Sequence, residues 1–502
     1  MTEELLYDLL IIGGGINGTG IALDAAGRDL KVMLCESDDL ASGTSSASTK
    51  LIHGGLRYLE HGNLWFVRES LLEREILLNK APHIIRPLRF IMPYSKSMRP
   101  AWLIRIGLFL YDHLGGRKIL PKSQSVNLRQ IPAGQILKST FTTGFSYFDC
   151  WADDSRLVAI NAISAEQLGA KILTRTKVIK ATRAFDHWLI TLADQRNGSV
   201  RQIKSKVLIN ATGPWADIVL RDELQLSNSQ HITLVKGSHI IVPRIGTHDE
   251  AMILQNTDQR IVFLIPYLEQ FTLIGTTDES FTGDPSKVEI SPDEIRYLCD
   301  AVNRFLQISI QPNDILHSYA GVRALVSSKE KNPAAISRDY HLQVDDEDGK
   351  CPLLSVFGGK LTTHRQLAEH ALLKLKPYFN HLQPAWTSHA TLSGGDIPDS
   401  DMNSFIASVL RQYHQFDAQL IKRYAHLYGT RIHLLLENIN TSKDLGKHYG
   451  SSLYHREVVY LIQYEFALTA ADILWRRTKL GYFFPNENLN ELIVAIKNLT
   501  LN

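Results

Sequence analysis

Cysteine is scarce in this chain, and its wide spacing excludes two classes of protein. The four cysteines, Cys35, Cys150, Cys299 and Cys351, are scattered over 502 residues. A disulfide scaffold needs a denser cysteine framework, and a cysteine-based zinc site needs closely spaced ligands. We therefore expect no disulfide and no metal site, in a protein of the reducing cytoplasm.

Long hydrophobic runs are also missing. The longest apolar stretch, Pro100–Leu114, still contains Arg105 and Asp112. A helix that spans a bilayer needs about 20 mainly apolar residues, so none is predicted. The N-terminal sequence MTEELLYDLLIIGGG has acidic residues and no basic region before its apolar run. This pattern predicts a first strand and not a secretory signal.

An excess of charge of either sign is absent as well, since the formal net charge is +2. Such a balance argues against a general nucleic-acid-binding role, but it leaves room for a local phosphate pocket. Hydrophobic residues make up 44% of the chain, enough for a large core, and the length predicts two or three domains.

What is present begins with a glycine-rich turn. The apolar run Tyr7–Ile12 predicts a buried strand, Ile16–Arg28 has helical spacing, and Lys31–Cys35 is the next strand. Between the first strand and the helix lies G-x-G-x-x-G, formed by Gly13, Gly15 and Gly18. These glycines permit a tight turn, close approach of a pyrophosphate, and close packing of helix on strand. Glu36 follows the second strand, where a carboxylate can accept hydrogen bonds from a ribose. The pattern predicts a dinucleotide-binding βαβ unit.

Two further features favour FAD over NAD as the dinucleotide. The apolar strand Val207–Asn210 runs into the small turn Ala211-Thr212-Gly213, and the late strand Ser355–Phe357 runs into Gly358-Gly359-Lys360. A late strand that returns to the site can bring a helix N-terminus to the flavin end, where it stabilises negative charge on the ring.

Several longer strings resemble the FAD-dependent, aerobic-type glycerol-3-phosphate dehydrogenases, over nearly the whole chain. They are Ile11–Gly27, Thr44–Glu60, Asn210–Trp215, Lys236–Pro243, Gly275–Asp278, Gly321–Arg323, Leu354–Thr363 and Leu474–Lys479. The chain departs from the expected pattern at Ala324, where we expect proline, and at His364, where we expect tyrosine.

The resemblance implies oxidation of sn-glycerol 3-phosphate to dihydroxyacetone phosphate, by hydride transfer from C2 to N5 of FAD. It implies that Arg57, Arg323 and Lys360 face the substrate phosphate with Tyr58 beside them, and arginine suits this task because its planar fork binds phosphate oxygens in pairs. His239, Arg323 and Lys360 are the expected catalytic residues. His239 also contacts substrate and is the candidate base, with His53 and Lys360 as alternatives. The expected FAD-binding residues are Gly13, Gly15, Gly18, Glu36, Thr44, Ser45, Ser46, Ser48, Ala211, Thr212, Gly213, Gly358, Gly359, Leu361 and Thr362.

The expected fold is an α/β flavoprotein of the two-dinucleotide-binding-domain type, with a Rossmann-like FAD domain, a β-rich substrate domain and an all-helical C-terminal domain. We assign residues 1–75, 151–230 and 351–385 to the FAD domain and residues 231–350 to the substrate domain. Residues 76–150 are expected to be a helical segment facing substrate and membrane, and residues 386–502 a helical cap that includes a helix over Glu457–Arg477.

The resemblance also implies a membrane quinone as electron acceptor and a peripheral position on the inner face of the cytoplasmic membrane. Met98–Leu114 has the aromatic and basic residues of an interfacial helix, helped by Arg117 and Lys118. The alternatives are a buried core helix for this segment and, for the enzyme, a glycerol-3-phosphate oxidase that uses oxygen. A homodimer is one candidate for the oligomeric state.

Overall fold

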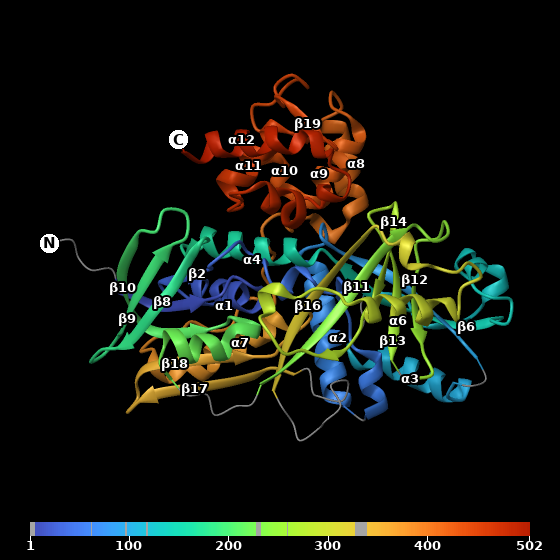
Figure 1. Ribbon diagram of the computed structural model, residues 1–502, viewed down its shortest axis with the longest axis horizontal. Coiled ribbons are helices and arrows are strands. Elements are labelled where there is room, and N and C mark those ends of the chain that lie inside the picture. Colours follow the sequence, from blue (N-terminus) through green and yellow to red (C-terminus); the bar gives the residue numbers. More distant parts are fainter. Residues whose placement is uncertain are drawn as a thin grey trace.

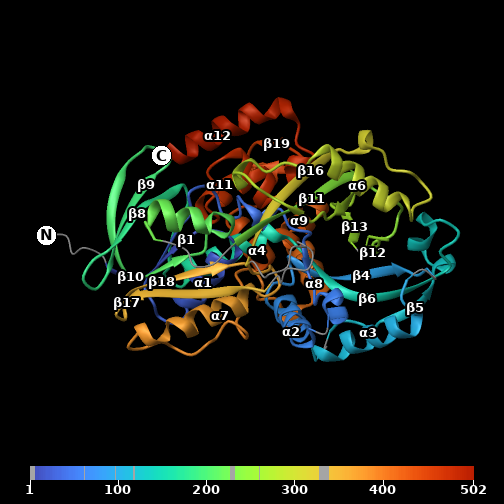
Figure 2. The same cartoon turned by 60° about the horizontal axis from the view of Figure 1, so that its bottom comes forward.

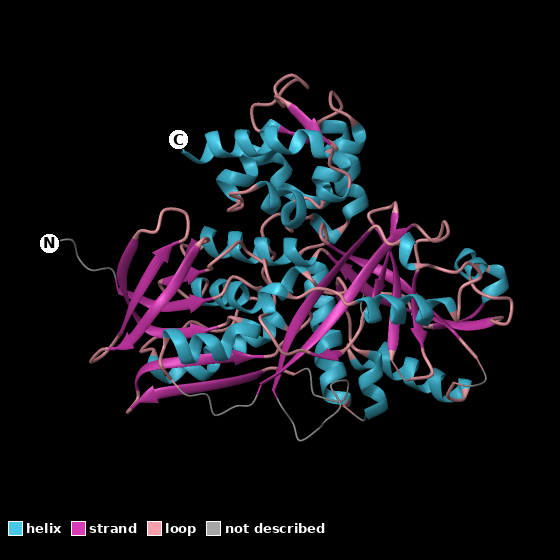
Figure 3. Ribbon diagram, viewed as in Figure 1, coloured by secondary structure: helices cyan, strands magenta, loops and turns pink. Residues whose placement is uncertain are grey.

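The computed structural model describes residues 6–61, 63–95, 98–116, 119–226, 232–258, 260–326 and 339–501. In the view of Figure 1, two β-sheets lie next to each other and a mainly helical C-terminal lobe lies above them. Figure 3, coloured by secondary structure, shows that most strands belong to the two sheets and that the lobe is mainly helical. The chain leaves the first sheet and returns to it twice, so each sheet is built from distant parts of the sequence.

The first sheet contains the predicted βαβ unit. Within the described ranges it has eight strands, and its central strands run parallel in the order β18-β10-β1-β2-β7. The strands are β1 (Leu6–Ile12), β2 (Val32–Cys35), β7 (Lys171–Leu173), β8 (Thr176–Arg183), β9 (Trp188–Asp194), β10 (Val200–Asn210), β17 (His341–Glu347) and β18 (Lys350–Phe357).

The two faces of this sheet are covered differently because side chains alternate along a strand. Leu9 and Ile11 of β1 pack under the helices α1 (Ile16–Ala26), α4 (Asp154–Gln167) and α7 (His364–Leu375). Leu10 on the opposite face packs with Trp188 of the β8–β9 hairpin. Burial on both faces explains why β1 is almost continuously apolar.

The second sheet carries the β-rich part of the chain. Its ten strands in the described ranges include the long antiparallel pair β11 and β16. The strands are β3 (Leu51–Ile52), β4 (Ile85–Pro93), β5 (Gln124–Asn127), β6 (Thr143–Ala152), β11 (Ile232–Pro243), β12 (Ala251–Gln255), β13 (Ile261–Tyr267), β14 (Phe271–Gly275), β15 (Glu279–Ser280) and β16 (His317–Val326). The helices α2 (Leu64–Lys80), α3 (Ala101–Leu114) and α6 (Pro292–Asn303) pack around it.

Two of the predicted boundaries are wrong. Residues 76–150 are not a wholly helical segment, because β4 lies within them and pairs with β6 over nine residues. The two prolines of β4 suggest breaks in the sequence, but at Pro87 β4 pairs with β6 while β12 joins β4 only at Phe90 and Ile91. A proline is tolerated in a strand where one side carries no ladder. In addition, β17 pairs with β18 in the first sheet, so the late return to that sheet begins before residue 351.

The C-terminal lobe is residues 402–501, and it is helical apart from one small hairpin. Its elements are α8 (Met402–Gln412), α9 (Ala418–Tyr428), α10 (Ile432–Leu435), β19 (His448–Gly450), β20 (Leu453–Tyr454), α11 (His455–Tyr464) and α12 (Leu489–Leu501). The predicted single helix over Glu457–Arg477 is wrong: α11 ends at Tyr464, Phe466 has a φ of 60°, and a separate π-helical turn covers Asp472–Arg477. The chain turns here because the buried carboxylate of Glu465 pairs with Arg156 of α4.

The rotated view in Figure 2 places α3 on the opposite side of the molecule from α12, as in Figure 1. Among the described residues, no helix has the length and apolar character needed to cross a membrane.

Candidate active site

The glycine-rich turn lies where β1 meets α1, and its backbone leaves no space for side chains. Gly13 has a φ of 110°, and a Cβ there would lie 2.7 Å from the carbonyl oxygen of Ala211. A Cβ on Gly18 would lie 2.0 Å from the oxygen of Gly13. A Cβ on Gly15 would lie 3.1 Å from Ser45 Oγ. The first N–H groups of α1 therefore stand at a turn that a phosphate can approach closely.

Glu36, directly after β2, supports this turn from the side. Its Oε2 accepts a hydrogen bond of 2.6 Å from the backbone N–H of Gly14, and its Oε1 accepts one of 2.8 Å from Asp38. Burial raises the pKa of Glu36, although these backbone donors stabilise the carboxylate. Glu36 thus shapes the turn and also faces the cavity in which a ribose would lie.

A cavity of about 710 Å³ extends from Glu36 past the glycine turn to the second sheet. Of the predicted cofactor residues, it is lined by Gly13, Gly15, Glu36, Thr44, Ser45, Ala211, Thr212, Gly213, Gly358 and Gly359, and Arg323 lines it as well. Its volume suits a large ligand. Asn17, which the sequence analysis overlooked, donates from Nδ2 to the oxygen of Gly358 at 3.1 Å. Within the described ranges its buried Oδ1 has no hydrogen-bond partner.

The hydroxyl-rich loop after β2, which contains Thr44, Ser45, Ser46 and Ser48, has some hydroxyls at the cofactor cavity and others that bond only to the protein around the loop. Ser45 Oγ accepts from the N–H of Ile16 at 3.0 Å, at the first turn of α1. Thr44 Oγ1 donates to the oxygen of Val322, next to Arg323. Ser46 donates to Gly43 and Ser48 to Asp154, so these two hydroxyls serve the protein's own structure.

The late glycine pair forms a second tight turn beside α1. Gly358 and Gly359 have φ angles of 75° and 98°, and a Cβ on Gly359 would lie 2.9 Å from Asn17 Nδ2. After this turn, the hydroxyl of Thr362 accepts a hydrogen bond of 3.2 Å from the N–H of His53. Leu361 is half-buried and packs against the hydrophobic core between the first sheet and the helices α1, α4 and α7. The loop therefore brings the segment His53-Gly54-Gly55 into contact with the segment that follows Gly358-Gly359-Lys360, although the two are far apart in sequence.

Two of the three predicted phosphate cations have described side chains. Arg323 of β16 forms an ion pair with Asp278 at 2.5 Å. Its guanidinium fits against the second sheet because Gly237 has no side chain: a Cβ there would lie 2.5 Å from Nη2. Lys360 Nζ lies 4.4 Å from the ring centroid of Tyr58 and 3.5 Å from that of Phe66. The backbone of Arg57 belongs to the short helix Leu56–His61, but its side chain lies outside the described part of the chain.

His239 lies inside β11, not at its start, and is 1% exposed. Its Nε2 shares a hydrogen bond of 2.9 Å with Thr49 Oγ1, and its ring stacks on Tyr319 at 4.8 Å. Burial lowers the pKa of His239 well below its usual value, and the charge of Arg323 lowers it further. His239 is therefore a neutral imidazole at pH 7, with no described hydrogen-bond partner for its buried Nδ1.

Sequence reasoning missed three residues that shape this site: Asn17, Lys50 and Asp278. Lys50 is buried with its Nζ 2.9 Å from both carboxylate oxygens of Asp154. The available signal for Lys50 and Asp278 was their charge, because they lie within the segments Thr44–Glu60 and Gly275–Asp278 that carry the family resemblance. No group of three or more potential metal ligands is found in the part of the chain that the structure describes.

The glycine turn, the return loop and the cavity of about 710 Å³ between them fit a cofactor of the size of FAD. Fold and site together define an FAD-dependent oxidoreductase with an added helical lobe.

Comparison with known proteins agrees with this class. Residues 8–365 match the family described as FAD dependent oxidoreductase, and residues 385–499 match the C-terminal domain of alpha-glycerophosphate oxidase. The chain is 51% identical over 478 residues to glycerol-3-phosphate dehydrogenase from Pseudomonas aeruginosa, covering 95% of this chain and 92% of that one. It is 47% identical to D-erythritol 1-phosphate dehydrogenase from Brucella abortus, covering 95% of each chain. The solved structure of glycerol-3-phosphate dehydrogenase from Bacillus halodurans, complexed with FAD, has a TM-score of 0.78 and 27% identity, covering 100% of this chain and 92% of that one.

The chain therefore belongs to the family of FAD-dependent oxidoreductases that includes the glycerol-3-phosphate dehydrogenases.

Proposed function

We propose that this protein oxidises sn-glycerol 3-phosphate to dihydroxyacetone phosphate and passes the electrons to a membrane quinone. The observation that carries the proposal is the position of Arg323. It lines the same cavity as the glycine turn, on the strand that pairs with the strand of His239. A cation at the inner end of a dinucleotide cavity can bind a substrate phosphate beside the reacting carbon.

The chain's own residues supply binding and proton transfer. Bound FAD would supply the acceptor for the hydride of C2. Arg323 binds the phosphate with the planar fork that suits this group, and Lys360 adds a second positive charge. His239 is neutral and can accept the proton of the C2 hydroxyl. The hydrogen bond to Thr49 and the stack on Tyr319 fix the orientation of its ring.

The substrate class is tested by anaerobic reduction of the bound flavin. Glycerol 3-phosphate should bleach the flavin fully, whereas glycerol, which lacks the phosphate, should require a far higher concentration. Because one relative acts on D-erythritol 1-phosphate, that compound is the necessary third substrate. The proposal that glycerol 3-phosphate is the substrate would be refuted if D-erythritol 1-phosphate reduced the flavin faster, or if glycerol reduced it equally well.

The acceptor proposal rests on α3, whose two faces differ. Leu108 and Tyr111 are buried against the second sheet, while Trp102 and Phe109 on the outer face are 65% and 59% exposed. Trp65, at the start of the neighbouring helix α2, is 68% exposed. Exposed aromatic residues on one side of an amphipathic helix are typical of insertion into a lipid interface. Arg117 and Lys118, the basic residues expected to assist, lie outside the described residues.

An apolar cavity of about 190 Å³ lies beneath this surface. It is lined by Leu56 and Leu59, which flank Arg57 and Tyr58 in the sequence, and by Leu103 and Leu110 of α3. A quinone ring that enters from the lipid would therefore stand next to the segment that carries the substrate residue Tyr58. This arrangement supports quinone over oxygen as acceptor.

The membrane proposal is tested by replacing Trp102 and Phe109 together with serine. We expect weaker binding to liposomes with anionic lipid and lower quinone-linked activity, at unchanged dye-linked activity. The matched control is Ile493→Ser with Val494→Ser, because these residues are also exposed but lie on α12, on the other side of the molecule. Equal liposome binding by both double variants, or preferred reduction of oxygen by the wild type, would contradict the proposal.

A further inference from the structure

One segment of the C-terminal lobe, residues 465–483, contacts both sheets, and we call it the junction segment. Its aromatic residues pack on the second sheet: the ring of Tyr482 lies 5.6 Å from Tyr267 and 5.0 Å from His317. Its charged residues reach the first sheet. The junction segment thus touches both halves between which the cofactor cavity lies.

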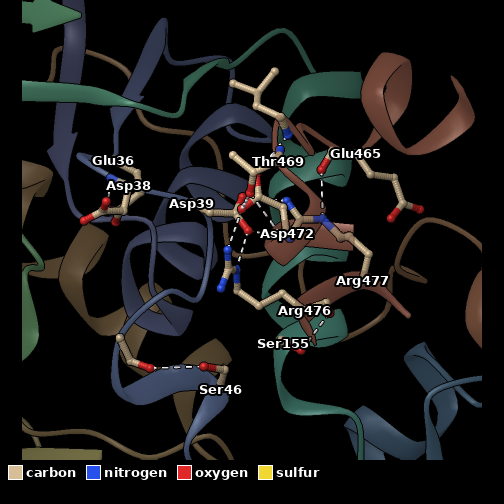
Figure 4. Close-up of polar contacts among 12 residues, drawn as sticks. Glu36, Asp38, Asp39, Ser46, Ser155, Glu465, Thr469, Asp472, Arg476 and Arg477 are labelled. Atoms are coloured by element: carbon tan, nitrogen blue, oxygen red, sulfur yellow. Dashed lines mark hydrogen bonds and ion pairs between the residues drawn. The ribbon is translucent and has the colours of Figure 1, made fainter. Parts of the chain in front are cut away.

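The strongest of these contacts is made to Asp39, which is fully buried. Arg477 donates from Nη1 and Nη2 to the two carboxylate oxygens of Asp39 at 2.9 and 2.8 Å, and Arg476 donates from Nε at 2.5 Å. Figure 4 shows both arginines converging on this carboxylate. Arg477 is as buried as Asp39, so its charge is compensated by this carboxylate, and the carboxylate in turn is compensated by both arginines.

Asp39 belongs to the loop that forms one wall of the cofactor cavity. Two residues later, Ala41 donates from its N–H to the oxygen of Gly14 at 3.1 Å. Farther along the same loop, Ser45 accepts from the N–H of Ile16. The loop therefore touches the glycine turn on both sides of Asp39, since Glu36 also binds Gly14.

A third ion pair reaches the cavity directly. Asp472 of the junction segment binds Arg175 at 2.8 Å, and Arg175 lines the cavity. The N–H of Arg175 also donates to the oxygen of Asp38, next to Asp39.

The far end of the loop is connected to the lobe through the start of α4. Lys479 Nζ lies 3.1 Å from Asp153, and Ser155 donates to the oxygen of Arg476 at 2.8 Å. The next carboxylate, Asp154, pairs with Lys50. The residue before Lys50 is Thr49, which shares a hydrogen bond with His239.

We propose that the C-terminal lobe is a positioning element for the cofactor loop, residues 39–50, with Arg477 and Lys479 as its positioning residues. Arg477 sets the start of the loop through Asp39, and Lys479 sets its end through Asp153 and the neighbouring Asp154–Lys50 pair. The loop in turn shapes the glycine turn, where the cofactor phosphates bind, and the partner of His239. The lobe thus preorganises the FAD site at a distance, because removing the Arg477 guanidinium takes away the two-point contact with the buried Asp39 carboxylate, and the contact from Arg476 Nε then remains.

The test is Arg477→Gln in the full-length protein, with FAD affinity as the readout. The matched control is Arg423→Gln, since Arg423 makes the same two-point contact with Glu457, at 2.8 and 2.6 Å, but entirely within the lobe. We expect the dissociation constant for FAD, measured by flavin fluorescence on reconstitution, to rise at least about tenfold in Arg477→Gln. Arg423→Gln should lower the melting temperature of the protein with less than about a twofold change in FAD affinity.

Two further variants, Arg477→Lys and Asp39→Asn, test the same contact if Arg477→Gln does not fold. Arg477→Lys retains the charge but loses the two-point geometry, and it should restore part of the FAD affinity. Asp39→Asn removes the partner charge from the other side and should alter the visible circular dichroism of the bound flavin. Wild-type FAD affinity in folded Arg477→Gln or Asp39→Asn would overturn the proposal, and so would equal loss of FAD in Arg423→Gln. The readout is FAD binding and not turnover, so the result is independent of the proposed substrate.

Discussion

Replacing Arg323 with alanine tests the proposed phosphate site most directly. In the structure the guanidinium lines the cofactor cavity and pairs with Asp278. The substitution therefore has two effects on substrate binding. It removes a charged donor for the phosphate, and it removes a cation that pairs with the carboxylate of Asp278, whose negative charge then acts more strongly on an incoming anion.

The size of each effect can be estimated. Loss of one charge-assisted hydrogen bond costs about 1.5–3 kcal/mol, or roughly 10- to 150-fold in substrate affinity. Asp278 and Arg323 are 13% and 26% exposed, so water screens the released carboxylate. Its repulsion of the phosphate should add about 1 kcal/mol, or about fivefold.

Stopped-flow flavin reduction under anaerobic conditions separates binding from the chemical step. Arg323→Ala should raise the apparent dissociation constant for glycerol 3-phosphate by the product of both factors, while FAD stays bound. The double variant Arg323→Ala with Asp278→Asn should regain about fivefold. Reduction by glycerol should be nearly unaffected, because glycerol carries no phosphate. Unchanged constants for glycerol 3-phosphate, or an equal loss with glycerol, would remove Arg323 from the phosphate site.

Three further predictions follow from individual residues. His239→Asn should slow flavin reduction by about a hundredfold while substrate affinity changes little, since a positioned base acts on the chemical step; reduction at wild-type speed in a stopped-flow experiment would transfer the role to His53 or Lys360. Burial lowers the pKa of His83 to about 3 and that of His364 to about 4, so below pH 6.5 the unfolded chain binds the extra protons and stability falls as pH drops. Each histidine should cost about 2 kcal/mol between pH 7 and pH 5, and urea unfolding of His364→Gln should show a correspondingly smaller loss. Gly13→Ala should abolish FAD binding, because its Cβ would meet the Ala211 carbonyl; Gly198→Ala, which also has a positive φ but has open space around it, should keep a normal flavin content.

Local sequence was sufficient for the βαβ unit and its turn. The strand, the three glycines, the helix and Glu36 follow one another within about thirty residues. The spacing of the three glycines between a strand and a helix can be recognised without knowledge of the rest of the fold, although Gly13 and Gly15 also lie against the distant residues Ala211 and Ser45. The sequence also predicts that most of the C-terminal lobe is helical, because the apolar residues of helices such as α9 recur with the helical period.

Local sequence failed where a distant partner overrides the pattern. The helix expected over Glu457–Arg477 breaks because Glu465 pairs with Arg156, which lies 309 residues away. The strand β4 was hidden by its prolines, which are accommodated only by the pairing that β6 and β12 provide.

The sequence alone determined that the chain binds a dinucleotide and carries an arginine and a lysine in strings rich in glycine. Only the tertiary structure decided which charges meet. Arg323 forms its ion pair with Asp278 because β16 pairs with β11 and β11 pairs with β14. Asp39 contacts Arg477, which is 438 residues away in the sequence, because the lobe packs against the first sheet. Backbone geometry at a glycine turn is a property of a few neighbouring residues, whereas a buried ion pair exists only once both charges have been taken out of water together.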